Sequence, residues 1–114
     1  MKFMLLIHQG TTPIPGTDAW ENLSQEEKGA VYAGYQDVNQ TPGLTSGQQL
    51  AGPDQATTVR VQDGAAQTSD GAIADPLGGY AFLEADDLDA AVAVAAKVPA
   101  ARMGGAVEVR PIAG

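Results

Sequence analysis

The sequence has 114 residues, 14 of them acidic and 6 basic, which gives a formal net charge of −8 at pH 7. This length predicts a single domain over residues 1–114. An acidic surface repels phosphate backbones and anionic lipid, so we expect neither nucleic acid nor a membrane as a partner. The chain has no cysteine, which excludes disulfides, thiolate zinc sites and thiol nucleophiles.

The segment Lys2–His8 predicts a first strand that is buried on both faces, because every position from Phe3 to Ile7 is apolar. The apolar run is too short for a signal peptide or a membrane span, so we expect a cytoplasmic protein. Glycine and proline punctuate Gln9–Asn22, which predicts a connecting loop that holds the single tryptophan, Trp20.

Ser24 and Glu27 have the spacing of a capping box and predict the start of a helix that Pro42-Gly43 ends. Two glycines inside this helix, Gly29 and Gly34, each cost about 1 kcal/mol relative to alanine, so packing must stabilise it. Apolar residues follow at helical spacing, at Val31, Tyr35 and Val38.

Two strands are predicted next, Leu44–Leu50 and Thr57–Val61, and we expect them to pair as a hairpin across the break at Gly52–Asp54. Asp63-Gly64 is a two-residue turn signal that leads into a weak strand at Ala65–Thr68.

The strand predicted at Gly79–Ala85 is again apolar on both faces. Asp86 and Asp87 can cap a second helix, which Pro99 ends. A final strand is predicted at Ala106–Pro111. The apolar stripe expected on the second helix is formed by Leu88, Ala91, Val92, Ala95 and Ala96.

This order of elements predicts an α+β fold, with a mainly antiparallel sheet and both helices on one of its faces. The other face is left bare, although the strands at Lys2–His8 and Gly79–Ala85 present apolar residues on it. We therefore expect a homodimer in which a partner sheet covers that face. The alternative is that the extra hairpin and the Gln9–Asn22 loop fold over it.

Several stretches resemble, in order and spacing, the YCII-related family and its DGPF-domain branch. The resemblance implies a ferredoxin-like fold assembled as a dimeric α+β barrel. The biochemical role of that family is largely unassigned, although some members are regarded as enzymes and some genes lie beside those of sigma factors. The stretches that carry the resemblance are Met1–Ile7, Ala56–Arg60, Thr68–Gly71, Leu77–Tyr80, Pro99–Arg102 and Val107–Pro111.

The sequence departs from the family at positions that matter for chemistry. The Asp-Gly-Pro-Phe motif is replaced by Asp70-Gly71-Ala72-Ile73, and a shortened stretch, Ala74–Pro76, follows it. Members credited with a catalytic histidine and aspartate carry them where this chain has Val31 and Val98. Neither valine moves a proton, so that chemistry is not inherited, and we expect both valines to pack in apolar surroundings.

His8 is the only histidine and follows the Met4 and Leu6 side of its strand. An imidazole suits a general base at neutral pH, and Asp70 is the predicted carboxylate that orients it, which makes this pair the candidate catalytic site. The alternatives are a strand-end histidine bonded to a backbone carbonyl and an aspartate that bonds its own turn.

Trp20 and Tyr80 are candidate ligand-binding residues, since they combine apolar surface with a polar donor. Tyr35 shares these properties but is expected in the core. Arg60 is a candidate for binding a ligand carboxylate, with Glu84 or Glu108 as the alternative partners of the arginines. No metal-ligand spacing or phosphate-binding loop is present, so no metal or other cofactor is expected.

Three functions remain open from the sequence. The favoured one is a small-molecule binding or accessory protein with a pocket between sheet and helices or at the dimer cleft. A small lyase or isomerase that uses His8 with Asp70 is the second, and a protein-interaction module linked to sigma-factor regulation is the third.

Overall fold

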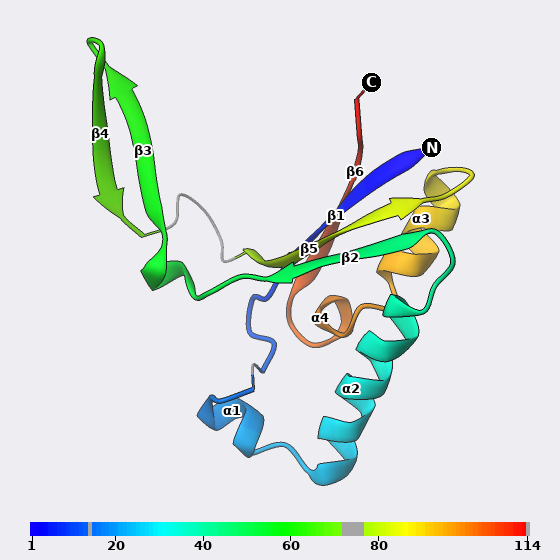
Figure 1. Cartoon of the computed structure of the whole chain (residues 1–114). Coiled ribbons are helices and arrows are strands. Elements are labelled where there is room, and N and C mark those ends of the chain that lie inside the picture. The colour runs from blue at the N-terminus through cyan, green and yellow to red at the C-terminus, as the bar shows by residue number, and fades with distance from the viewer. Residues whose placement is uncertain (14, 72–76, 114) are drawn as a thin grey trace.

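The computed structural model describes residues 1–13, 15–71 and 77–113. Within these residues, four strands form an antiparallel sheet and two further strands form a hairpin that projects away from it (Figure 1). The sheet has the order β2-β5-β1-β6, and its members are β1 (Lys2–His8), β2 (Leu44–Gln49), β5 (Leu77–Glu84) and β6 (Ala106–Pro111). The hairpin consists of β3 (Thr57–Gln62) and β4 (Ala65–Asp70).

The helices within residues 18–39 and 88–102 lie on one side of the sheet, where they cover the core (Figure 1). Phe3 and Leu5 of β1 are completely buried on this side, together with Leu83 of β5. The protein therefore has the predicted α+β architecture, with a mainly antiparallel sheet consistent with a ferredoxin-like fold. The helical elements are α1 (Asp18–Glu21), α2 (Gln25–Asn39), the short 3₁₀ helix η1 (Pro53–Gln55), α3 (Leu88–Ala95) and α4 (Pro99–Arg102).

The capping box predicted at the start of α2 is present. The backbone N–H of Glu27 donates to the Ser24 hydroxyl at 3.0 Å, and the backbone N–H of Ser24 donates to the Glu27 carboxylate at 2.9 Å. These hydrogen bonds lower the pKa of Glu27 below its ordinary value of 4.5. Asp87 likewise caps α3, since its carboxylate accepts from the backbone N–H of Ala90 at 2.8 Å.

The segment predicted to be a plain loop, Gln9–Asn22, contains the single-turn helix α1. The local cause is an N-cap, because the Thr17 hydroxyl accepts from the backbone N–H of Trp20 at 3.4 Å. The helix places Trp20 in a buried position. The loop lies on the helix side of the sheet, not over the bare face.

The predicted hairpin between Leu44–Leu50 and Thr57–Val61 is wrong. The strand β2 pairs with β5 in the main sheet, whereas β3 pairs with β4. The reason lies in the turn at Asp63-Gly64, where both residues have positive φ, 53° and 77°, as a tight two-residue hairpin turn requires. A strand that follows such a turn pairs with the strand before it, and β2 is left free to join the sheet.

The apolar stripe predicted for the second helix is wrong in part. Ala91 and Ala95 are buried against the sheet, but Leu88 and Val92 are 52% and 49% exposed. The buried face also includes Val94, which packs against the cluster around Phe3. Since α3 is apolar on nearly every side, the spacing of apolar residues alone does not determine which face turns inward.

The two glycines of α2 have different surroundings. A Cβ added to Gly34 would lie 2.9 Å from Cγ of Pro99, whereas a Cβ added to Gly29 would meet no atom within 4 Å. Pro99 is buried at the start of α4, so it has little room to move. Gly34 therefore allows α2 to approach α4 closely, and Gly29 has no such role.

This contrast predicts opposite effects for the same substitution in one helix. Gly29→Ala should raise the free energy of unfolding by about 1 kcal/mol, because alanine is the better helix former. Gly34→Ala should lower it by about 1–2 kcal/mol, because the cost of overpacking exceeds that gain. Urea denaturation of both variants measures the difference, and a Gly34→Ala variant as stable as Gly29→Ala would contradict the close approach of α2 and α4.

Candidate functional site

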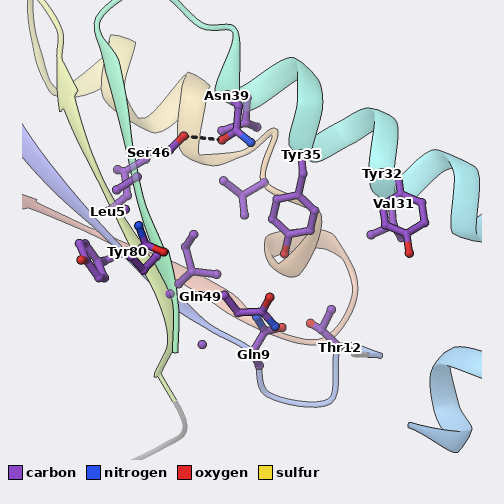
Figure 2. Close-up of a pocket in the computed structure, with 18 of the residues that line it drawn as sticks. Leu5, Gln9, Thr12, Val31, Tyr32, Tyr35, Asn39, Ser46, Gln49 and Tyr80 are labelled. Atoms are coloured by element: carbon purple, nitrogen blue, oxygen red, sulfur yellow. Dashed lines mark hydrogen bonds between the residues drawn. The ribbon is translucent and has the colours of Figure 1, made fainter. Parts of the chain in front are cut away.

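A cavity of about 340 Å³ lies between α2 and the sheet (Figure 2). Its wall is formed by the end of β1, the segment that leads to α1, the inner side of α2, and parts of β2 and β5. Protein cavities that bind small molecules start at about this volume. Segments from three distant parts of the sequence therefore meet around one space large enough for a small ligand.

Much of the wall is apolar. Leu5 contributes from the sheet, and Val31 and Val38 contribute from α2. Trp20 closes the side next to α1, where its ring packs edge to face on Tyr32 with the centroids 5.4 Å apart. This part of the cavity suits the apolar body of a ligand.

Polar side chains gather at one end of the cavity. Figure 2 shows the Tyr35 hydroxyl pointing from α2 toward the region where Gln9, Gln49 and Thr12 lie. The Gln9 side chain lies close enough to the Tyr35 hydroxyl to act on its pKa. A ligand that occupies the apolar part would meet these groups at its other end.

A second polar contact lies at the opposite end of the wall. The Ser46 hydroxyl of β2 donates to the Asn39 side-chain oxygen of α2 at 2.8 Å (Figure 2). Both residues line the cavity. The hydrogen bond ties the C-terminal end of α2 to the sheet and fixes the width of the cavity there.

Thr12 is held in place by its backbone. Its N–H donates to the Gln9 carbonyl at 2.9 Å, and the N–H of the preceding Thr11 donates to the Gly104 carbonyl at 3.1 Å. The Thr12 side chain is buried, with the residue only 6% exposed, and its Oγ1 has no hydrogen-bond partner among the described residues. A buried hydroxyl without a partner costs about 1–3 kcal/mol.

Burial raises the pKa of Tyr35 above its ordinary value of 10.0, and the nearby Gln9 side chain opposes that effect. The neutral phenol is therefore the form that the folded protein favours. At neutral pH, Tyr35 acts in the cavity as a neutral hydrogen-bonding group.

The raised pKa of Tyr35 predicts a loss of stability in alkali. At a pH below the unfolded-state pKa of 10.0, the Tyr35 phenol is neutral in both the folded and the unfolded chain, so its protonation does not reduce the free energy of unfolding. As the pH rises through the folded-state pKa, the unfolded chain loses the proton first, and the free energy of unfolding falls. Tyr35→Phe should lack this part of the decrease in denaturant titrations at about pH 9 and pH 11. Tyr32→Phe is the control at an exposed position of α2, and an unchanged pH profile in Tyr35→Phe would contradict the effect.

The two residues of the predicted catalytic pair are not brought together. His8 lies on the sheet face opposite the cavity, and its Nε2 is 3.5 Å from Oε1 of Glu108 on the neighbouring strand β6. Asp70 is the last residue of β4, in the separate hairpin. The carboxylate next to His8 is thus that of Glu108, which in turn lies 3.4 Å from Nε of Arg110.

The three predicted ligand-binding residues have different locations. Trp20 lines the cavity. Tyr80 contributes to the wall from β5, but its ring stands on the other side of the strand, beside Phe82 with the centroids 6.0 Å apart (Figure 2). Arg60 is exposed on the hairpin strand β3 and takes no part in the cavity wall. Their roles in binding stay predictions.

Tyr35, expected in the core, packs against the cluster of Val38, Val98 and Ala100 and also lines the cavity. The polar lining residues were not among the predicted site residues; they are Gln9, Thr12, Asn39, Ser46 and Gln49. One of them carries a sequence signal. Asn39 follows Tyr35 by four residues and shares the inner face of α2, so it is a polar residue on an apolar stripe. The other four carry no such signal in their local sequence, because only the packing of the strands and the loop brings them to the cavity.

Val31 and Val98 are buried, with 7% and 1% of their surface exposed. Val98 packs with Val38 and Ala100, as its predicted apolar surroundings require. Both valines also contribute to the cavity wall. The family resemblance implies a histidine and an aspartate at these two positions. In this chain both positions face the same cavity, and both are occupied by valine.

Within the described ranges, no three His, Asp or Glu side chains come together as possible metal ligands. Among the helices of the described residues, none is long and apolar enough to cross a membrane.

The model of the YCII-related domain matches residues 1–113, so the chain belongs to the YCII-related family. A comparison with curated proteins gives no match. The resemblance to the DGPF branch stays a prediction, and the altered part of its motif, with the stretch that follows it at 72–76, lies outside the described residues.

Proposed function

We propose that this protein binds a small molecule in the cavity between α2 and the sheet. The observation that carries the proposal is the cavity itself, an apolar space of about 340 Å³ that ends in a set of convergent polar groups. This combination is typical of ligand sites, in which apolar contact supplies affinity and a few polar groups supply orientation.

The lining of the cavity favours binding over acid–base catalysis. Among its described residues there is no histidine, aspartate, glutamate or lysine. The one titratable side chain type is tyrosine, and burial raises the pKa of Tyr35. A general base needs a pKa near the working pH, and burial moves Tyr35 away from that condition.

A thermal-shift screen with a library of neutral and charged metabolites tests the proposal. A ligand at 100 times its Kd adds about 2.7 kcal/mol of stability, which raises the melting temperature by roughly 10 °C in a domain of this size. Val31→Phe fills the cavity and should abolish the shift. Val92→Phe places the same ring on the exposed side of α3 and should preserve it. The proposal fails if no compound raises the melting temperature, or if the shifts in Val31→Phe equal those of the wild type.

We also propose that two copies associate through the bare face of the sheet. Met4, Leu6, Tyr80 and Phe82 share this face, and Phe82 is 41% exposed. The described parts of the loop and the hairpin, the alternative covers, lie elsewhere, since the loop lines the cavity and the hairpin projects outward (Figure 1). A stable dimer buries about 800 Å² per partner, and we expect the interface to extend from this sheet face onto its neighbouring loops.

Light scattering at micromolar concentration tests this association. The wild type should have twice the mass of the 11.7 kDa chain. Phe82→Glu places a charge in the proposed interface and should give a monomer, because an unpaired charge is costly to bury. Val92→Glu is the matched control on the exposed side of α3 and should remain dimeric. A monomeric wild type would refute the association.

A further inference from the structure

We propose that the ligand of the α2 cavity is an uncharged molecule with an apolar body and a polar end that hydrogen-bonds to the Thr12 hydroxyl. This inference rests on the proposed binding function and specifies the chemical class of its ligand. It follows from three observations: the charge of the lining, the unpartnered hydroxyl of Thr12, and the donor and acceptor groups beside it.

The lining contains no charge at neutral pH among its described residues. The chain has 20 Asp, Glu, Lys and Arg residues among its 114. None of them is among the roughly twenty described residues that line the cavity, so this lining is less charged than the chain as a whole. A buried carboxylate or ammonium group without an opposite charge is strongly disfavoured. The cavity therefore selects against charged ligands of either sign.

Thr12 supplies the point of attachment. Its Oγ1 is buried and unpartnered within the described part of the chain, although the backbone of the same residue is fixed by hydrogen bonds. Figure 2 shows the hydroxyl on the side of the residue that faces Gln9 and the cavity. Buried polar groups in native proteins almost always have a partner, so a group on the ligand is the natural one here.

The neighbours of Thr12 determine what kind of group can bind. Gln9 and Gln49 carry side-chain amides, which both donate and accept, and the Tyr35 hydroxyl does the same. Gly78 makes room for Gln9, because a Cβ at Gly78 would overlap the Gln9 side chain. A primary amide, a carbonyl or a hydroxyl on the ligand can satisfy this set, and none of them carries a charge.

Apolar residues determine the rest of the ligand. Trp20, Val31 and Val38 line the space beyond the polar end. A planar ring or a compact aliphatic body fits between them, since the volume of about 340 Å³ is at the lower end of the range for ligand sites. Small aromatic amides, phenols and ketones belong to this class.

Benzamide and benzoate form a matched pair of probes, because they have the same ring and nearly the same shape and differ in charge. Titration of ¹⁵N-labelled protein should show benzamide binding with shifts at Thr12, and benzoate binding at least tenfold more weakly. Thr12→Val should weaken benzamide at least tenfold and raise the melting temperature of the free protein, because it removes the unpartnered hydroxyl. Thr11→Val is the control, since the Thr11 hydroxyl is exposed and contacts Gly104.

The outcomes separate this inference from the function on which it rests. If benzoate binds as tightly as benzamide, or if charged compounds give the shifts in the metabolite screen, the inference is wrong and the binding function stands. An unchanged affinity for benzamide in Thr12→Val refutes the role of Thr12. If neither probe nor any metabolite binds, both the inference and the proposed function fail.

Discussion

The burial of Phe3 and Leu5 beneath the helices is the interaction on which the rest of the structure depends. Both residues lie on β1, which pairs with β5 on one side and with β6 on the other, and both are completely buried. Each contributes about 2–3 kcal/mol by leaving water. Few large side chains share this position, because the helices above them present mainly alanine, including Ala91, Ala95 and Ala100. Small side chains let α3 and α4 lie close to the sheet.

The cavity follows from the way in which α2 differs from these two helices. Near its middle, Gly34 brings it against Pro99, and at its C-terminal end Asn39 bonds to Ser46 of the sheet. Its side chains toward the sheet are larger than alanine, with Val31, Tyr35 and Val38 on that side. The helix is thus attached at two points, at Pro99 and at Ser46, and its larger side chains keep its axis away from the sheet. The segment that carries Thr12 and Trp20 closes the remaining space from the side.

The sequence predicted the architecture well and the site only in part. Short runs of apolar residues predicted the central strands β1 and β5, and Ser24 with Glu27 predicted the start of α2, because these signals are local. The partner of β2 and the inward face of α3 were wrong, because strand pairing and helix rotation depend on tertiary packing. Trp20 was selected for the pocket on its chemistry. Thr12 and Gln9 were missed, since nothing in their local sequence shows that they meet α2 across the fold.

The separate hairpin has a consequence for how the chain loses its structure. Every residue of β4 and five of the six residues of β3 are exposed, including Val59 and Val61. A two-stranded ribbon without a third strand or a covering helix is only marginally stable in water. Its hydrogen bonds therefore open at a small fraction of the free energy needed to separate β1 from β5 and β6. We therefore expect amide hydrogens of β3 and β4 to exchange with solvent long before those of the main sheet, and the hairpin to melt as its own unit while the core around Phe3 stays folded.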